Sequence, residues 1–124
     1  MARHEGGCQC GAVRYAVELE LDNLITCNCS RCGKLGSVLA FAPASAFELK
    51  QGQDSLTEYR FNSHKISHLF CKTCGIQSFG RGVGPDGAEM AAINVRTLDD
   101  VDVAFIRAPG QIKAVVELPP AYPR

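Results

Sequence analysis

The chain has 124 residues, of which 46% are hydrophobic, and this length and composition suit one domain with a packed core. Its 13 Lys and Arg residues balance 13 Asp and Glu residues, and the sequence pI is about 6.8. A nucleic-acid surface would need a basic stripe, and an anionic membrane would need a run of like charge. The sequence has neither, so we expect no nucleic-acid partner and no membrane partner.

The N-terminal residues MARHEGGCQC lack the apolar stretch of a secretory signal, and no run of about 18 apolar residues could span a bilayer. We therefore expect a cytoplasmic protein, monomeric or homodimeric, in which His4 belongs to a mobile terminus. We expect one domain over residues 1–124, with a core at about 5–118 and a Pro-rich tail at 119–124. In a reducing compartment the seven cysteines favour metal binding over disulfides.

Alternating apolar and polar residues predict short strands along the chain. The clearest case is residues 12–20, where Val13, Tyr15, Val17 and Leu19 share one face. Further strands are predicted at 37–42, 46–49, 56–61, 66–71, 77–79, 89–95 and 112–118. The pattern predicts an all-β domain, with any substantial helix hidden within residues 24–36.

Three other segments are predicted to connect these strands. Residues 51–54 are predicted to form a turn, and residues 98–101 one helical turn with Thr97 as its cap. The stretch GVGPDG at 82–87 matches G-x-G-x-x-G, but its Pro-Asp-Gly sequence is typical of turns and no helix follows. We therefore expect residues 80–87 to form a hairpin loop and not a nucleotide cradle.

Cys27, Cys29 and Cys32 place three thiols within six residues. Zinc takes thiolate ligands in a tetrahedron, and this spacing lets three sulfurs converge on one ion. The stretch itself offers no fourth ligand, and the nearest following carboxylate is Glu48. Three protein ligands with an open fourth position are typical of a catalytic zinc site.

The remaining cysteines allow two divisions of the seven sulfurs. In the first, a closed structural site takes the two pairs outside the central triplet, and it ties the N-terminal arm to a C-x-x-C-G knuckle; its members are Cys8, Cys10, Cys71 and Cys74. In the second, Cys29 and Cys32 join Cys71 and Cys74 in a zinc ribbon. That ribbon would be unusually long, and it would leave Cys8, Cys10 and Cys27 without a metal site. We prefer the first division. Gly6, Gly7 and Gly11, beside the first pair, are expected to let the backbone turn around an ion, because glycine tolerates positive φ. Gly75 of the knuckle is expected to let backbone N–H groups turn toward the sulfurs, which disperses thiolate charge.

The ordered motifs GGCQCGAVRY, CNCSRC, FCKTCG and INVRTLDD resemble the glutathione-dependent formaldehyde-activating (GFA) enzyme family, which includes centromere protein V. The resemblance runs from about Gly6 to Asp100. It implies a β-tent fold, two zinc ions and carbon–sulfur lyase activity on glutathione adducts. It assigns Cys8, Cys10, Cys71 and Cys74 to a structural zinc, and Cys27, Cys29 and Cys32 to a catalytic zinc.

The sequence departs from the family pattern at Gln9 and Asn28, where histidine is frequent in the family. Neither position is a ligand in that pattern, so these departures bear on the substrate and not on metal binding. Glutathione with formaldehyde is one candidate substrate pair among several.

Five other side chains are considered as contributors to the site. Arg31 and Lys34 flank the triplet and are candidates for binding a substrate carboxylate, with a solvated surface charge as the alternative. His68 is a candidate general base, although a hydrogen-bonded structural role is the favoured interpretation. His64 and Asn94, the latter within the INVR motif, have no role that the sequence assigns.

The predicted function is therefore a zinc-dependent carbon–sulfur lyase whose thiol substrate takes the open position beside Cys27, Cys29 and Cys32. The rival class is a non-catalytic protein-binding module in which both zinc ions are structural. A third interpretation is a thiol sensor whose triplet holds metal loosely or not at all. A vacancy in the triplet favours the enzyme, and a blocked fourth position favours the module.

Overall fold

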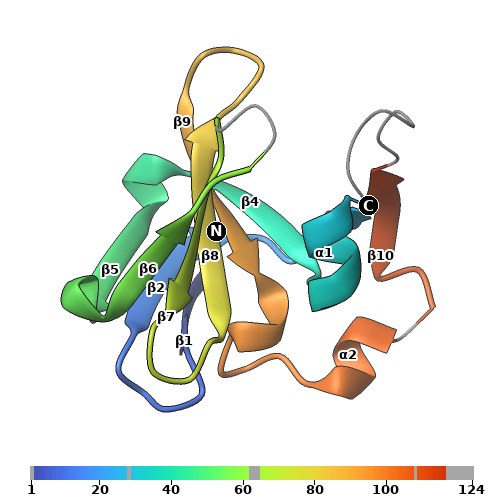
Figure 1. Cartoon of the computed structure of the whole chain (residues 1–124). Helices are drawn as coiled ribbons and strands as arrows, with labels where there is room; N and C mark the ends of the chain where they lie inside the picture. The colour runs from blue at the N-terminus through green and yellow to red at the C-terminus, as the bar shows by residue number, and fades with distance from the viewer. Residues whose placement is uncertain (1, 28, 62–64, 108, 117–124) are drawn as a thin grey trace.

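The computed structural model describes residues 2–27, 29–61, 65–107 and 109–116. Within these ranges the chain is mostly β-structure, with two short α-helices and three 3-10 turns (Figure 1). The strands are β1 (Ala2–Gly7), β2 (Arg14–Leu19), β3 (Leu24–Cys27), β4 (Leu39–Pro43), β5 (Phe47–Gln51), β6 (Leu56–Tyr59), β7 (Ser67–Cys71), β8 (Gln77–Val83), β9 (Glu89–Asn94) and β10 (Ile112–Val116). The helical elements are α1 (Ser30–Leu35), α2 (Val103–Arg107), η1 (Ala44–Ala46), η2 (Gln53–Ser55) and η3 (Val95–Thr97). The predicted all-β class is confirmed, and α1 lies within the segment expected to hide a helix.

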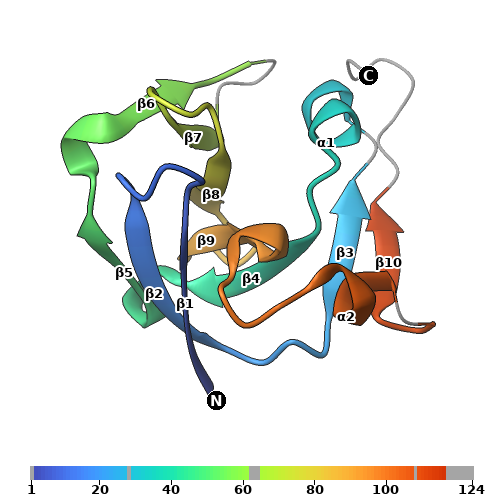
Figure 2. The same cartoon turned by 90° about the horizontal axis from the view of Figure 1, so that it is seen from below.

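The strands form two sheets. The smaller sheet has the order β1-β2-β5, and the larger has the order β10-β3-β4-β9-β8-β7-β6. Every pair is antiparallel except β10 with β3, which are parallel. Figure 2 shows the smaller sheet on one side of the molecule, with β3 and β10 at the opposite edge beside α1 and α2. None of the helices in the described ranges is long and apolar enough to cross a bilayer.

The hydrophobic core lies between the two sheets. Val13, Tyr15, Val17 and Leu19 are at most 3% exposed, as the alternation of 12–20 predicts. The ring of Phe47 packs 5.5 Å from that of Tyr15 and 4.6 Å from that of Phe79, measured between centroids. Aromatic pairs at these separations add to the free energy gained from burial alone. This packing joins β2 and β5 of the smaller sheet to β8 of the larger one.

Two predicted connections are wrong. The segment 80–87 is not all loop, because β8 continues to Val83 and the turn is confined to the tip, where Gly84 N donates to Ala88 O at 2.8 Å. Residues 98–101 are not helical; the helical turn lies earlier, as η3, and Asn94 caps it by accepting from Arg96 N. Thr97 ends η3, where its hydroxyl donates to Asn94 O at 2.7 Å. The sequence pattern misplaced the end of β8 because pairing with β9 extends that strand to Val83. It misplaced the helical turn because Asn94 caps η3 and so sets where the turn begins.

The N-terminal arm is also more ordered than the sequence suggests. His4 lies in β1, and its Nδ1 is 2.7 Å from Asp100 Oδ2, so the expectation of a mobile terminal residue is wrong. Asp99 N donates to Glu5 O at 2.9 Å, and Arg14 pairs with the Asp99 carboxylate. The segment after β9 therefore anchors β1 and β2. The expected Pro-rich tail lies outside the described residues.

Candidate metal centres and adjoining cavities

The first cluster brings four sulfurs from two distant segments together. The Cys10 Sγ lies 3.7 Å from both Cys8 Sγ and Cys71 Sγ, and all four sulfurs, with that of Cys74, lie within 4.8 Å of one another. A tetrahedral zinc with Zn–S bonds of about 2.3 Å would place its sulfurs about 3.8 Å apart. The donor set and its spacing therefore fit one zinc ion.

Local backbone geometry arranges these sulfurs. Cys8 and Cys10 lie in the turn between β1 and β2, where Gly11 has a φ of 85°. Cys71 ends β7, and Gly75 follows Cys74 with a φ of 79°. The positive φ of Gly11 matches its expectation, whereas Gly6 and Gly7 do not adopt positive φ and instead belong to β1.

Gly7 serves close packing. A Cβ at Gly7 would lie 2.2 Å from Val13 O, a distance that no backbone could accept without moving.

Backbone N–H groups donate to the sulfurs of this cluster. Val13 N donates to Cys8 Sγ at 3.3 Å, and Thr73 N donates to Cys71 Sγ at 3.4 Å. Such donors disperse thiolate charge, as the knuckle pattern predicts.

The four thiols ionise unequally. The backbone N–H groups of Ile76 and Cys10 lower the pKa of Cys74 to about 6. At Cys10 the N–H of Ala12 acts in the same direction, but burial and the neighbouring thiols outweigh it and raise the pKa to about 11. Crowded thiolates repel one another, so a divalent cation among them would displace the remaining protons.

The second cluster is built within one short segment. Cys27 ends β3, Cys29 is the N-cap of α1 and Cys32 lies inside α1, and their sulfurs are within 4.8 Å of one another. Cys32 N donates to Cys29 Sγ at 3.3 Å. Gly36 closes the helix in the left-handed region, with its N–H donating to Cys32 O. Asn28 lies outside the described residues.

Electrostatics of the triplet favour one thiolate at Cys29. Burial alone would raise the Cys29 pKa, but the N–H groups of Cys32 and Arg31 outweigh burial and lower it. Burial raises the pKa of Cys32 to about 12, with the Cys29 charge adding to the rise and the Ser37 hydroxyl acting against it. Ser37 Oγ is buried and makes no hydrogen bond to another group among the described residues, so its hydroxyl can be directed at the Cys32 sulfur. Three convergent sulfurs with such a donor fit a metal ion bound through three protein ligands.

The triplet lines a cavity of about 240 Å³ beside the larger sheet. His68 also lines this cavity, and its ring stacks on Phe61 with centroids 5.1 Å apart. The sequence favoured a hydrogen-bonded structural histidine, but this ring makes no hydrogen bond within the described part of the chain. Burial and the nearby Arg31 charge lower the His68 pKa, so the imidazole is neutral at pH 7.

Arg31 and Lys34 line a neighbouring cavity of about 260 Å³, and Phe61 borders both cavities. Arg31 is held in place, because its Nε donates to Gln77 Oε1 at 2.9 Å and its guanidinium lies 4.9 Å from the Tyr59 ring centroid. It is therefore not the solvated surface charge that was weighed as the alternative. Lys34 is exposed in the last turn of α1.

Asn94 gains a structural role that the sequence did not provide. Its side chain is 7% exposed; Nδ2 donates to Gln77 O at 3.0 Å and Oδ1 accepts from Arg96 N at 3.3 Å. It thus holds the end of β9 against β8, at the wall of the 240 Å³ cavity. His64 lies outside the described residues.

Sequence reasoning missed the aromatic walls, Phe41, Tyr59, Phe61 and Phe79, and it missed Gln77 as the residue that holds Arg31. Except for Phe61, which follows β6, these residues lie in strands that are separate in the sequence. Alternation in the sequence indicates which residues share a face of one strand, but it does not indicate which strands pack around the same cavity.

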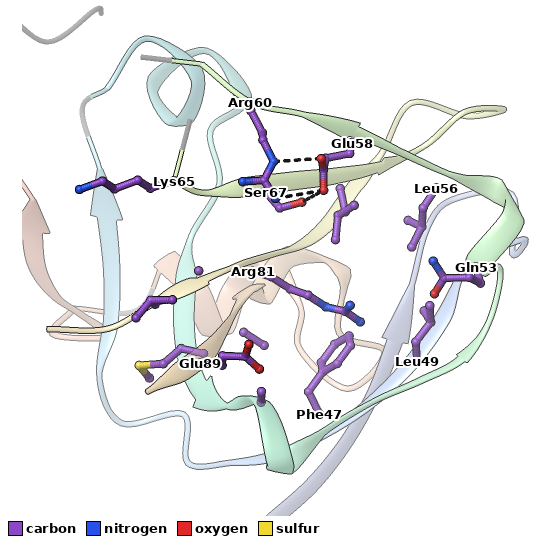
Figure 3. Close-up of a pocket in the computed structure, with 16 residues that line it drawn as sticks. Phe47, Leu49, Gln53, Leu56, Glu58, Arg60, Lys65, Ser67, Arg81 and Glu89 are labelled. Atoms are coloured by element: carbon purple, nitrogen blue, oxygen red, sulfur yellow. Dashed lines mark hydrogen bonds and ion pairs between the residues drawn. The ribbon is translucent and has the colours of Figure 1, made fainter. Parts of the chain in front are cut away.

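A third cavity, of about 610 Å³, lies on the opposite face of the larger sheet and extends to β5 (Figure 3). Its charged groups are of both signs. Glu58 is engaged by Arg60 at 2.9 Å and by the Ser67 hydroxyl at 2.6 Å, while Arg81 projects over the Phe47 ring. No cysteine lines this cavity, so it is separate from both clusters.

The spatial grouping corresponds to the first division of the sulfurs. The structure joins Cys8 and Cys10 with Cys71 and Cys74, and it keeps Cys27, Cys29 and Cys32 together as a second group. Within the described chain, Cys29 and Cys32 do not gather with the 71–74 pair as a zinc ribbon would require.

Two comparisons with known proteins bear on this arrangement. The family model described as glutathione-dependent formaldehyde-activating enzyme matches residues 3–117. The fold is also similar to the crystal structure of a Rhodobacter sphaeroides protein determined as a Northeast Structural Genomics target. That protein is 31% identical, the match covers 90% of this chain and 99% of that chain, and the TM-score is 0.78.

Proposed function

The chain belongs to the glutathione-dependent formaldehyde-activating enzyme family, and from that premise we propose that it is a zinc-dependent carbon–sulfur lyase acting on glutathione-type thiol adducts. The observation that carries this proposal is the triplet of sulfurs lining a cavity next to a cationic one. Cys27, Cys29 and Cys32 would hold the catalytic zinc. Cys8, Cys10, Cys71 and Cys74 would hold a structural zinc.

A zinc ion bound by three thiolates supplies a fourth position at which a substrate sulfur is stabilised as thiolate at neutral pH. The rest of the site would bind and orient the molecule that carries this sulfur. Arg31 offers its two Nη groups, since its Nε is already occupied by Gln77. A guanidinium fixed in this way suits a carboxylate, and Lys34 adds a second positive charge in the same cavity.

His68 would handle the proton of the reaction. In the lyase direction the adduct hydroxyl loses its proton to a ring nitrogen of His68, the C=O bond forms, and the C–S bond breaks. The bonding electrons stay on the sulfur, which leaves as thiolate, and the carbonyl compound is released. The reverse sequence of steps makes the adduct. A neutral imidazole suits this role, and the lowered His68 pKa supports it.

Cobalt substitution tests the proposal. Co²⁺ replaces the metal of the purified protein, and glutathione is then titrated against its visible spectrum, with S-methylglutathione as the blocked control. Glutathione should shift the ligand-field and sulfur charge-transfer bands, because its thiol adds a ligand, and the blocked thiol should not. An unchanged spectrum at saturating glutathione would reject the lyase proposal in favour of the protein-binding module.

A further inference from the structure

The cavity beside the triplet lies over a row of residues on one face of the larger sheet. Pairing aligns His68 of β7 with Gly80 of β8, Gly80 with Ala92 of β9, and Ala92 with Phe41 of β4. Directly opposed residues present their side chains on the same face of a sheet. All four line the cavity. The two smallest residues are central and the two rings flank them, so the sheet face is hollowed into a trough floored by Gly80 and Ala92.

The remaining walls of this trough are apolar. Leu39 lies beside Phe41 along β4, and Phe61 and Ile66 complete the side near His68. Phe41 and Ile66 are each 46% exposed, which is high for large apolar side chains that face a cavity. Binding of an apolar ligand against such exposed walls is favourable, because the ligand removes apolar surface from water.

The polar groups of the trough are largely committed to the protein. The amide oxygen of Gln77 accepts from Arg31, and both polar atoms of the Asn94 side chain bond to backbone groups. Apart from these, His68 and the three sulfurs are the polar side chains of the described lining. Polar chemistry is therefore concentrated at the reacting end, and the rest of the trough offers apolar contact.

The trough is large for a one-carbon substituent. Its volume is about 240 Å³, whereas one water occupies roughly 30 Å³ of liquid. Formaldehyde adds two heavy atoms to a thiol, so most of the apolar wall would stay wet around that adduct. Resting on the proposed function, we infer that the substrate of this site is the thiol adduct of an aldehyde with an apolar aliphatic or aromatic tail, which fills the trough over Gly80 and Ala92.

Calorimetric titration of S-methyl-, S-propyl- and S-hexylglutathione tests this without relying on turnover. Affinity should rise about fourfold for each methylene that enters the trough, from the transfer free energy of a buried methylene. An affinity that is equal along the series overturns the inference. The cobalt response to free glutathione reports the proposed function separately, so an equal-affinity series with an intact cobalt response rejects only the apolar-tail inference.

Variants locate the tail. Ala92→Leu fills the floor of the trough and should remove the dependence on chain length, and Phe41→Ala removes a wall and should weaken it. Ala88→Leu makes the same change at the exposed tip of the β8–β9 hairpin and should keep the wild-type series. Folding of each variant is checked by circular dichroism. A full chain-length dependence in folded Ala92→Leu and Phe41→Ala protein would place the tail elsewhere and overturn the inference.

Discussion

The two cysteine clusters use the same donor atom but are built differently. The four-cysteine cluster joins segments 61 residues apart, between Cys10 and Cys71, and Cys71 is fully buried in the core. The three-cysteine cluster forms between the end of β3 and the first turn of α1, and it lines a cavity. A metal in the first would close a long loop of chain, whereas a metal in the second would constrain six residues. Ligand type alone therefore does not separate a structural metal site from a reactive one. The two clusters differ in whether they join distant segments or line a cavity.

Removing one ligand from each cluster should give the largest contrast. Cys71→Ala should abolish cooperative unfolding, because a structural zinc contributes about 10 kcal/mol or more and a whole domain has a stability of only about 5–15 kcal/mol. Cys29→Ala should stay folded and lose about 1 kcal/mol as α1 loses its N-cap, while its triplet no longer binds metal. Thermal unfolding followed by circular dichroism measures both. Equal destabilisation of the two variants would contradict the division of roles.

Mild chelation should separate the clusters less drastically. The triplet offers three ligands and is open to the cavity, so its ion should leave first, and about one zinc per chain should remain. Elemental analysis after dialysis against a weak chelator gives the stoichiometry, and circular dichroism checks that the fold persists. Parallel loss of both ions without unfolding would mean that the four-cysteine cluster does not hold the fold together.

The smallest effect concerns the cavity beside the triplet and depends on pH. Burial lowers the His68 pKa from its ordinary 6.5, so the unfolded chain binds this proton more readily than the folded chain does. The stability from the neutral ring is present above about pH 6.5 and is lost as the pH falls through the lower, folded-state pKa. Wild-type protein should therefore lose more stability on acidification than His68→Gln.

Urea unfolding of the two proteins at about pH 7.5 and about pH 5.5 measures this difference. Cysteine protonation and metal release contribute to both proteins, so the comparison between them isolates His68. Identical losses of stability would show that folding does not lower the His68 pKa.

Much of this molecule follows from local pattern. The alternation in residues 12–20 predicts the buried face of β2, because a half-buried strand must alternate. The C-x-C and C-x-x-C spacings predict sulfurs that can converge, because the one or two intervening residues keep the cysteines close whatever the rest of the chain does. The family resemblance, carried by the order of these motifs, agrees with the match over residues 3–117.

Other features depended on contacts between distant segments. Asp99 and Asp100 contact β1 from more than ninety residues further along the sequence, as the separation of 96 between His4 and Asp100 illustrates. The grouping of Cys10 with Cys71 was one of two divisions that the spacing allowed, and the packing of the smaller sheet on the larger one decided between them. The trough at Gly80 and Ala92 exists because four strands align in one register, and local sequence carries no information about register between strands. Sequence therefore determined the cysteine ligands and the apolar faces of the strands. Tertiary structure decided which cysteines share a site and which strand faces line a cavity, because those contacts depend on packing between distant segments and not on spacing along the chain.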